Sequence, residues 1–193
     1  QGEYLDALKR LATAADRFPE DPSVHRGRAA IYQAQMLRGG SRGPLLQQAQ
    51  AALLRAKELD PRDPRTSLDL SQLYRLAGDL ETAARYALLA SSYEPIPGSA
   101  SRALAAILVE QGRKALEARE LEKATGLAGN ASVADPRGAA PHVLEGDVWL
   151  ERQELDKALA CYRRARELEP ASAEAIHALA ECHRRRGGAY FLY

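Results

Sequence analysis

The sequence has few of the residues that mark redox or metal chemistry, with 2 cysteines, 4 histidines, 1 methionine and 1 tryptophan in 193 residues. Two cysteines cannot build the disulfide framework of a small secreted domain. No apolar run approaches the roughly 18–20 residues that a membrane-spanning helix needs, so no membrane span is expected. The opening residues, QGEYLDALKR, do not have the pattern of a signal peptide.

An excess of charge is also missing, because 27 basic residues face 26 acidic ones. Neither half of the chain has the basic surplus that attracts nucleic acid or anionic lipid, so no nucleic-acid partner is expected. Of the basic residues 22 are arginine, and Asn130 is the single asparagine, a bias typical of GC-rich genomes. This composition favours a bacterial source.

A sequence frame recurs five times along the chain. An apolar or aromatic residue is followed by Ala after three residues, by a second Ala seven later and by Pro after five more. The windows are YLDALKRLATAADRFP, LQQAQAALLRAKELDP, LETAARYALLASSYEP, LEKATGLAGNASVADP and LDKALACYRRARELEP, starting at 4, 46, 80, 121 and 155. The closing prolines Pro19, Pro61, Pro95, Pro136 and Pro170 are 42, 34, 41 and 34 residues apart. Such a period predicts a protein of stacked repeats.

Each frame predicts a helix that ends close to its proline, because proline lacks the N–H that would continue the helix. Upstream lies a second apolar segment in which a small residue precedes a bulky one by three positions. The pairs are Ala29/Tyr32, Ser71/Tyr74, Ala105/Leu108 and Gly146/Trp149. Small residues let helices approach closely, so each repeat is predicted to be a helix hairpin, turning at Gly78 in one unit and at Gln153 and Glu154 in another.

This combination resembles the tetratricopeptide repeat (TPR) family, whose unit of about 34 residues is a helix–turn–helix. The resemblance implies an all-α, right-handed α-α superhelix (solenoid) of five to six hairpins, forming a single domain over 1–193. Its repeats are 2–21 (partial), 22–63, 64–97, 98–138, 139–172 and 173–193 (partial). Two residues depart from the family pattern, Glu145 in place of Leu and His183 in place of an aromatic. Because the chain starts and stops within repeats, we expect it to be part of a larger or processed protein.

Two repeats are longer than 34 residues, by eight residues near Gln33–Arg42 and by seven near Gly112–Ala118. One extra turn in each helix of a hairpin would account for such a surplus. Residues 112–124 have a helical pattern that is compatible with these longer helices. Residues 37–44, LRGGSRGP, are instead expected to form a mobile loop. The two tips are predicted to protrude on one edge of the superhelix. They either grip a partner or are tolerated insertions.

No catalytic or cofactor-binding set is recognisable in the sequence. GGSRG at 39–43 lacks the spacing of a phosphate-binding loop. Cys161, His177, Cys182 and His183 gather near the end of the chain, but their spacing fits no zinc motif, and two buried thiols are the simpler interpretation. A Cys161–Cys182 disulfide would need an oxidising compartment. The run HRRRGG at 183–188 suits either a solvated helix end or a contact with phosphate or an acidic partner.

The resemblance implies a concave groove lined by the first helix of each hairpin, which binds a peptide or helix of a partner. Its predicted lining residues are Arg26, Gln33, Arg65, Leu68, Gln72, Arg75, Arg102, Val109, Asp147, Leu150, His177, Glu181 and Arg184. Arginine and glutamine beside leucine in the early units predict an acidic partner with apolar anchors. The asparagines that other family members use to clamp the tails of heat-shock chaperones are missing here.

The sequence thus predicts a non-enzymatic protein-interaction scaffold, in the assembly or localisation of a larger bacterial complex such as pilus, secretion or envelope machinery. The alternatives are a regulatory TPR module of a larger enzyme and a helical-repeat RNA binder. Self-association through incomplete terminal hairpins is a further expectation. A cytoplasmic location is favoured, and a periplasmic or lipoprotein form follows if a signal was removed.

Overall fold

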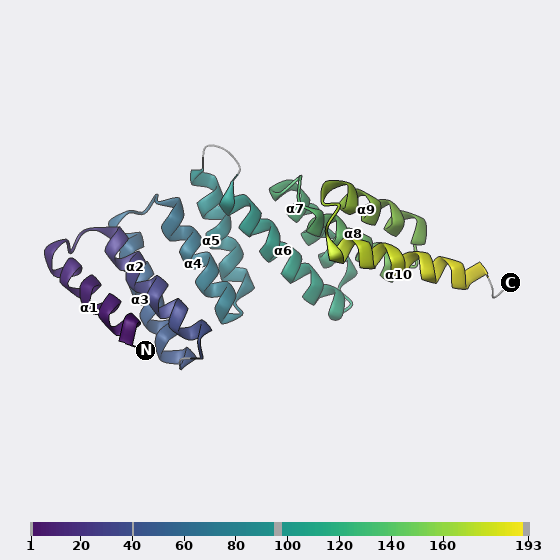
Figure 1. The fold of residues 1–193 in the computed structure, drawn as a ribbon. Helices are drawn as coiled ribbons and strands as arrows, with labels where there is room; N and C mark the ends of the chain where they lie inside the picture. The colour runs from purple at the N-terminus through teal and green to yellow at the C-terminus, as the bar shows by residue number, and fades with distance from the viewer. Residues whose placement is uncertain (1, 40, 95–97, 191–193) are drawn as a thin grey trace. The chain divides into compact units, whose positions relative to one another are not determined.

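The computed structural model describes residues 2–39, 41–94 and 98–190, and these residues form helices joined by short turns (Figure 1). They make up two compact units, 1–100 and 101–193. The first five helices are α1 (Gly2–Arg17), α2 (Pro22–Leu37), α3 (Arg42–Leu59), α4 (Pro64–Ala77) and α5 (Leu80–Tyr93). The others are α6 (Ser99–Glu117), α7 (Leu121–Ala134), α8 (Ala139–Glu151), α9 (Leu155–Leu168) and α10 (Ala173–Tyr190). Within the described residues the predicted all-α fold is confirmed.

The prolines end helices as predicted. Helices α1, α3, α7 and α9 each stop two residues before Pro19, Pro61, Pro136 and Pro170. Pro95 lies outside the described residues. Two helices begin with an Asp-Pro pair, in which aspartate accepts hydrogen bonds from the first backbone N–H groups and proline occupies a position that needs none. Asp21 has this role for α2, and Asp63 has it for α4.

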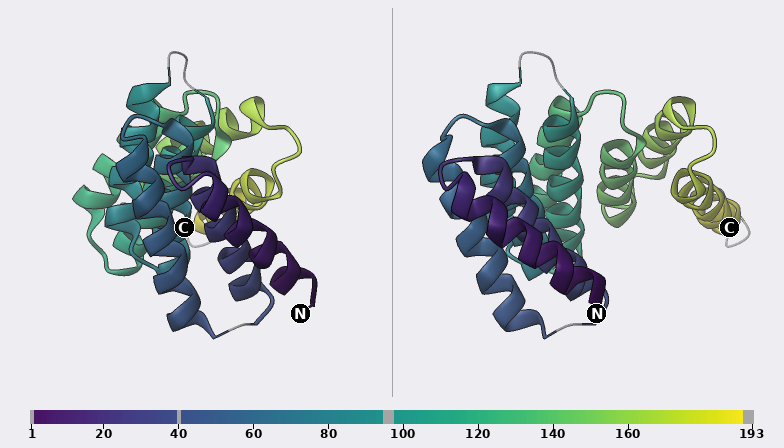
Figure 2. Two further views of the ribbon diagram at one scale, coloured as in Figure 1. Left: turned by 90° about the vertical axis from the view of Figure 1, so that its left-hand side faces the viewer. Right: turned by 60° about the vertical axis from the view of Figure 1, so that its left-hand side comes forward.

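The helices pair into hairpins, α2 with α3 and α4 with α5 in the first unit, and α8 with α9 in the second (Figure 2). The alanine frame is buried in α3, α5, α7 and α9. Ala49, Ala56, Ala83, Ala90, Ala124, Ala131, Ala158 and Ala165 are all 0% exposed. Of the first pair, Ala14 is half-buried, and the side chain of Ala7 lies outside the described part. Small side chains at these positions allow close helix contact, as the frame predicted.

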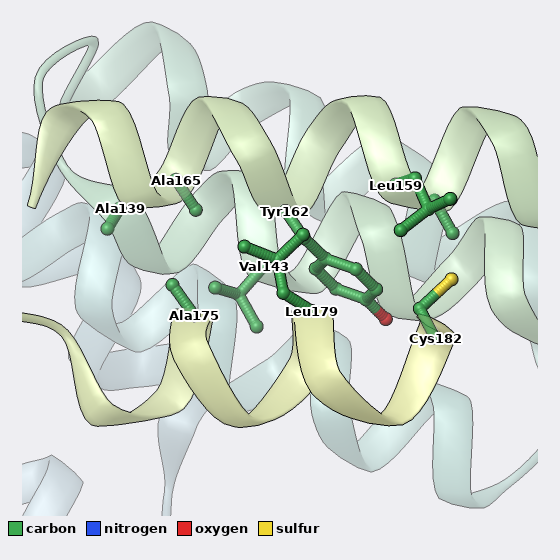
Figure 3. Packing of buried hydrophobic residues seen from close by; sticks show 9 residues of the cluster. Ala139, Val143, Leu159, Tyr162, Ala165, Ala175, Leu179 and Cys182 are labelled. Carbon is green, nitrogen blue, oxygen red and sulfur yellow. The ribbon is translucent and has the colours of Figure 1, made fainter. Parts of the chain in front are cut away.

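The predicted notch at Gly146 receives an aromatic ring from the neighbouring helix. A Cβ atom at Gly146 would lie 2.4 Å from Cε1 of Tyr162 on α9. Tyr162 is itself 0% exposed and packs with Val143 of α8 and Leu179 of α10 (Figure 3). The glycine therefore sets the distance between α8 and α9.

The turns between paired helices share a left-handed residue. Gly78 ends α4 with φ of 87°. Gln153, in the turn after α8, has φ of 64°, and Arg119, after α6, has φ of 59°. Gly78 and Gln153 thus lie at the predicted turns. Gly39, between α2 and α3, also has φ of 90°, so glycine, which adopts this backbone region freely, occupies two of these four positions.

The extra residues of the two long repeats are distributed differently from our prediction. Helices α2 and α3 have 16 and 18 residues, against 14 in each of α4 and α5. The predicted loop 37–44 is too long, because α3 already begins at Arg42 and its first turn accepts Pro44 without needing that N–H. Gly40 lies outside the described residues. In the other repeat α6 has 19 residues and α7 has 14, so one helix takes most of the surplus.

The tips of these long hairpins belong to different units. The tip between α2 and α3 lies in the first unit, and the tip formed by residues 112–124 lies in the second. Their predicted alignment on one edge therefore stays a prediction. The same holds for the assignment of the whole chain to a single solenoid domain.

Candidate functional site

The predicted groove residues all lie on the first helices of the hairpins. Helix α2 carries Arg26 and Gln33, α4 carries Arg65, Leu68, Gln72 and Arg75, α6 carries Arg102 and Val109, α8 carries Asp147 and Leu150, and α10 carries His177, Glu181 and Arg184. Each unit therefore holds its own part of this set, and the two parts are described separately.

Arg26 does not offer a free cation in the first unit. Its Nε donates to Oδ2 of Asp69 at 2.9 Å, and its Nη1 lies 3.5 Å from Oδ2 of Asp63. Burial raises the pKa of Asp69, against the effect of Arg26, while Asp63 keeps a lowered pKa because hydrogen bonds from Thr66 and Arg65 outweigh its burial. Our prediction that Arg26 attracts an acidic partner is therefore not supported, because two carboxylates already surround the guanidinium.

An accessible strip follows α4. Arg65, Leu68, Gln72 and Arg75 are spaced by three or four residues and share one helix face. Leu68 is half-buried and the other three are exposed. On α2, Gln33 has a buried amide nitrogen without a hydrogen-bond partner among the described residues. This strip keeps the polar and apolar mixture that the groove prediction requires.

Val109 on α6 is not a surface residue, which corrects its predicted place in the groove. It is 4% exposed and packs with Ala105, Ala128 and Leu144 in the core of the second unit. Arg102 on the same helix is exposed. The reason is helix geometry, since Val109 follows the buried Ala105 by four residues and shares its face.

In the second unit four predicted residues converge on one cavity of about 310 Å³. Asp147 and Leu150 of α8 face His177 and Glu181 of α10 across it. The other lining residues are Val143, Tyr162, Glu174 and Ala178. Helices α8 and α10 are neighbours, and α9, which lies above α10 in Figure 3, supplies Tyr162. Arg184 does not line the cavity and instead pairs with Glu181.

Sequence reasoning missed Glu174 and Tyr162 as cavity residues. Glu174 precedes His177 by three residues and Glu181 by seven, so helical spacing alone could have found it. The ring of Tyr162 lies on the packed face of α9, in the core. Its hydroxyl reaches the cavity and donates a hydrogen bond to Oδ1 of Asp147 at 2.7 Å.

The carboxylates of this cavity have different surroundings. Glu174 forms an ion pair with Arg113 of α6. Hydrogen bonds from Arg184 and Arg185 lower the pKa of Glu181 to about 2, so this side chain is ionised at neutral pH. Burial raises the pKa of Asp147, although the hydrogen bond from Tyr162 partly opposes that effect. Asp147 is thus the most desolvated acid of the three.

The first unit holds a second cavity, of about 360 Å³, that the sequence did not indicate. It lies between α2 and α3 and has basic and apolar walls. Its lining residues are His25, Arg28, Tyr32, Gln48, Ala51, Ala52 and Arg55. None of the predicted groove residues lines this cavity. The two on α2, Arg26 and Gln33, lie on a different helix face from His25, Arg28 and Tyr32.

The two cysteines are free thiols. Cys182 is 0% exposed and its Sγ lies 3.7 Å from the carbonyl oxygen of Leu155. No group of three or more His, Cys, Asp or Glu side chains in the described residues could hold a metal ion. The arginines of the 183–188 run that the structure describes pair with carboxylates, Arg184 and Arg185 with Glu181 and Arg186 with Asp156.

We expect Cys161 to be a poor nucleophile in the folded protein. Burial, followed by the nearby carboxylate of Glu145, raises its pKa to about 11. At pH 8 only about 0.1% of such a thiol is thiolate, the reactive form. Iodoacetamide should therefore label Cys161 far more slowly in the folded protein than in guanidinium at the same pH, as followed by mass spectrometry of tryptic peptides. Equal rates would contradict this placement.

None of the described helices combines the length and the apolar character needed to cross a membrane. No protein-family model matches this chain. No curated protein is a significant match either.

Solved structures do match the chain, at sequence identities of 16–18%. BtubC from P. vanneervenii superimposes with a TM-score of 0.66 at 17% identity, over 96% of this chain and 82% of its own. MamA gives a TM-score of 0.61 at 16% identity, over 90% of this chain and 86% of its own. Cut9, in the Cut9–Hcn1 hetero-tetramer of the APC/C, gives 0.55 at 18% identity over 94% of this chain. This chain spans 33% of that chain's length. The chain thus has the fold of the tetratricopeptide-type helical repeat proteins, an all-α solenoid of helix hairpins.

Proposed function

We propose that this protein is a non-enzymatic scaffold that binds a segment of a partner protein along its first helices. The observation that carries the proposal is the cavity in the second unit, where Asp147, Leu150, His177 and Glu181 from two successive first helices meet. Concave sites with apolar walls and a few polar groups are the usual binding sites of proteins.

Two further findings support this proposal. The similar protein Cut9 was solved in a hetero-tetramer with Hcn1, so a chain of this fold holds a protein partner there. The two thiols of our chain have raised pKa values and are poor nucleophiles. We place the scaffold in the assembly or localisation of a larger complex.

The proposal is tested by selecting peptides from a phage-displayed random library on the purified chain and measuring their affinity by calorimetry. Replacing Leu150 by lysine should weaken the selected peptides at least tenfold, about 1.4 kcal/mol, because it places a charge in the apolar wall. The matched control is Val133→Lys on α7, because the side chain of Val133 is 82% exposed and lies on a second helix.

Circular dichroism should show the same helix content for both variants. Failure to select any peptide, or equal affinities of the two variants, would count against the scaffold role. Loss of affinity in Leu150→Lys alone supports it.

A further inference from the structure

We infer that the cavity between α8 and α10 receives a positively charged side chain, arginine or lysine, from the partner segment. This inference rests on the proposed scaffold function and names the chemistry of its partner. It also reverses, for this cavity, the sequence-based expectation of an acidic partner.

The walls of the cavity suit the aliphatic part of a long side chain. Val143 is 2% exposed and Tyr162 is 0% exposed, so both are held in the core at the back of the cavity. Leu150 and Ala178 are half-buried beside them. Arginine and lysine pack their methylene stems along such surfaces while the charged group reaches polar partners. A volume of about 310 Å³ lies at the low end of the range for ligand sites, roughly 300–1,000 Å³, and fits one side chain with its flanking residues.

The charged groups that line the cavity are carboxylates. Asp147, Glu174 and Glu181 take part, together with the imidazole of His177, and none of the lining residues is lysine or arginine. A carboxylate or phosphate of a partner would therefore enter beside like charges. A guanidinium or ammonium group would enter beside opposite charges, and bidentate pairing with a carboxylate favours the guanidinium.

One of these carboxylates, Asp147, forms no direct ion pair with a described lysine or arginine. Glu174 is paired with Arg113, and Glu181 with Arg184 and Arg185. Among the described lysines and arginines none forms an ion pair with Asp147, whose recorded partner is the neutral hydroxyl of Tyr162 at 2.7 Å. Arg113 acts on Asp147 through its charge, although these two described side chains form no ion pair or hydrogen bond with each other. A half-buried carboxylate that lacks a direct ion-pair partner is a strong acceptor for a cation that enters from outside.

The cation is an organic one. The described His, Cys, Asp and Glu side chains include no group that could hold a metal ion. The apolar walls also contribute nothing to a metal site, whereas they match a side-chain stem. The carboxylates and the walls together therefore fit a basic residue better than an ion.

The test uses the peptides selected on the purified chain and two changes to each complex. In the peptide, arginine is replaced by citrulline, its neutral analogue, or lysine by norleucine. In the protein, Asp147→Asn removes the charge but still accepts the hydrogen bond from Tyr162, and Glu174→Gln is a second variant. Glu167→Gln is the control, since Glu167 is an exposed carboxylate of α9 that pairs with Arg164.

We expect the selected peptides to contain arginine or lysine, and Asp147→Asn to weaken them about tenfold, with about threefold for Glu174→Gln and no change for the control. The neutral peptides should bind the wild type and Asp147→Asn equally, since the interaction is then already lost. Peptides that bind with no dependence on Asp147, or on their own basic residue, would overturn this inference and leave the scaffold function standing. Selection of no peptide would overturn both.

Discussion

Replacing Gly146 by alanine is expected to lower the free energy of unfolding by about 2–3 kcal/mol, the upper part of the range for overpacked cores. The added Cβ would lie 2.4 Å from Cε1 and 2.6 Å from Cδ1 of Tyr162. Tyr162 cannot move away easily, because it is 0% exposed and its hydroxyl is bound to Asp147. Urea unfolding followed by circular dichroism measures the change.

Gly129→Ala provides a matched control on α7. Nothing lies within 4 Å of a Cβ atom at that position, and Gly129 is exposed within its helix. Alanine there should stabilise the protein by about 0.5–1 kcal/mol, because it is the better helix former. Adding Tyr162→Leu to Gly146→Ala should recover part of the loss by vacating the ring position. If both glycine variants shifted stability equally, the close contact between α8 and α9 would be wrong.

Replacing Asp63 by alanine should lower the free energy of unfolding at pH 7 by about 2 kcal/mol, at the top of the range for helix caps. Asp63 accepts hydrogen bonds from the backbone N–H of Arg65 and Thr66, both at 3.0 Å, and from the hydroxyl of Thr66 at 2.6 Å. Thr66 is 0% exposed, so its hydroxyl would lose a partner inside the protein. Arg26 would lose one of its two carboxylates.

The pH dependence of this variant distinguishes the cap from simple packing. Asp63 has a lowered pKa in the folded protein, so it binds a proton more readily when unfolded. Its ionised form therefore stabilises the fold above the unfolded value of about 3.9, and this contribution disappears as the pH falls through the lower folded value. The difference between wild type and Asp63→Ala should shrink between pH 5 and about pH 2. A constant difference over that range would argue against the charged cap.

The repeat frame allowed much of the fold to be predicted from sequence. Alanines at fixed spacing identified the buried helix faces, and prolines identified the helix ends, because both are local properties of the chain. Gln153 was expected at a turn and is found there with φ of 64°. The lengths of α6 and α7 were not predictable, since a seven-residue surplus can enter either helix with similar local preference.

The candidate site depended on contacts between distant residues, which is why prediction was incomplete. Arg26 pairs with Asp63 and Asp69, 37 and 43 positions later in the sequence, and this depends on how two hairpins align. The neutralisation of Arg26 therefore could not be read from its own helix. The burial of Val109, in contrast, was predictable from the sequence. Val109 follows Ala105 by four residues and therefore shares its helix face, but the groove prediction placed Val109 on the surface.

The left-handed turns have a consequence for how this protein can vary. Arg119 and Gln153 adopt a backbone conformation that costs most side chains about 1 kcal/mol, which Gly78 avoids at the corresponding turn. Both are exposed and neither lines either cavity. A change to glycine at either position should therefore raise the thermal stability of the protein, whether it arises in evolution or by design. It should leave partner recognition unchanged.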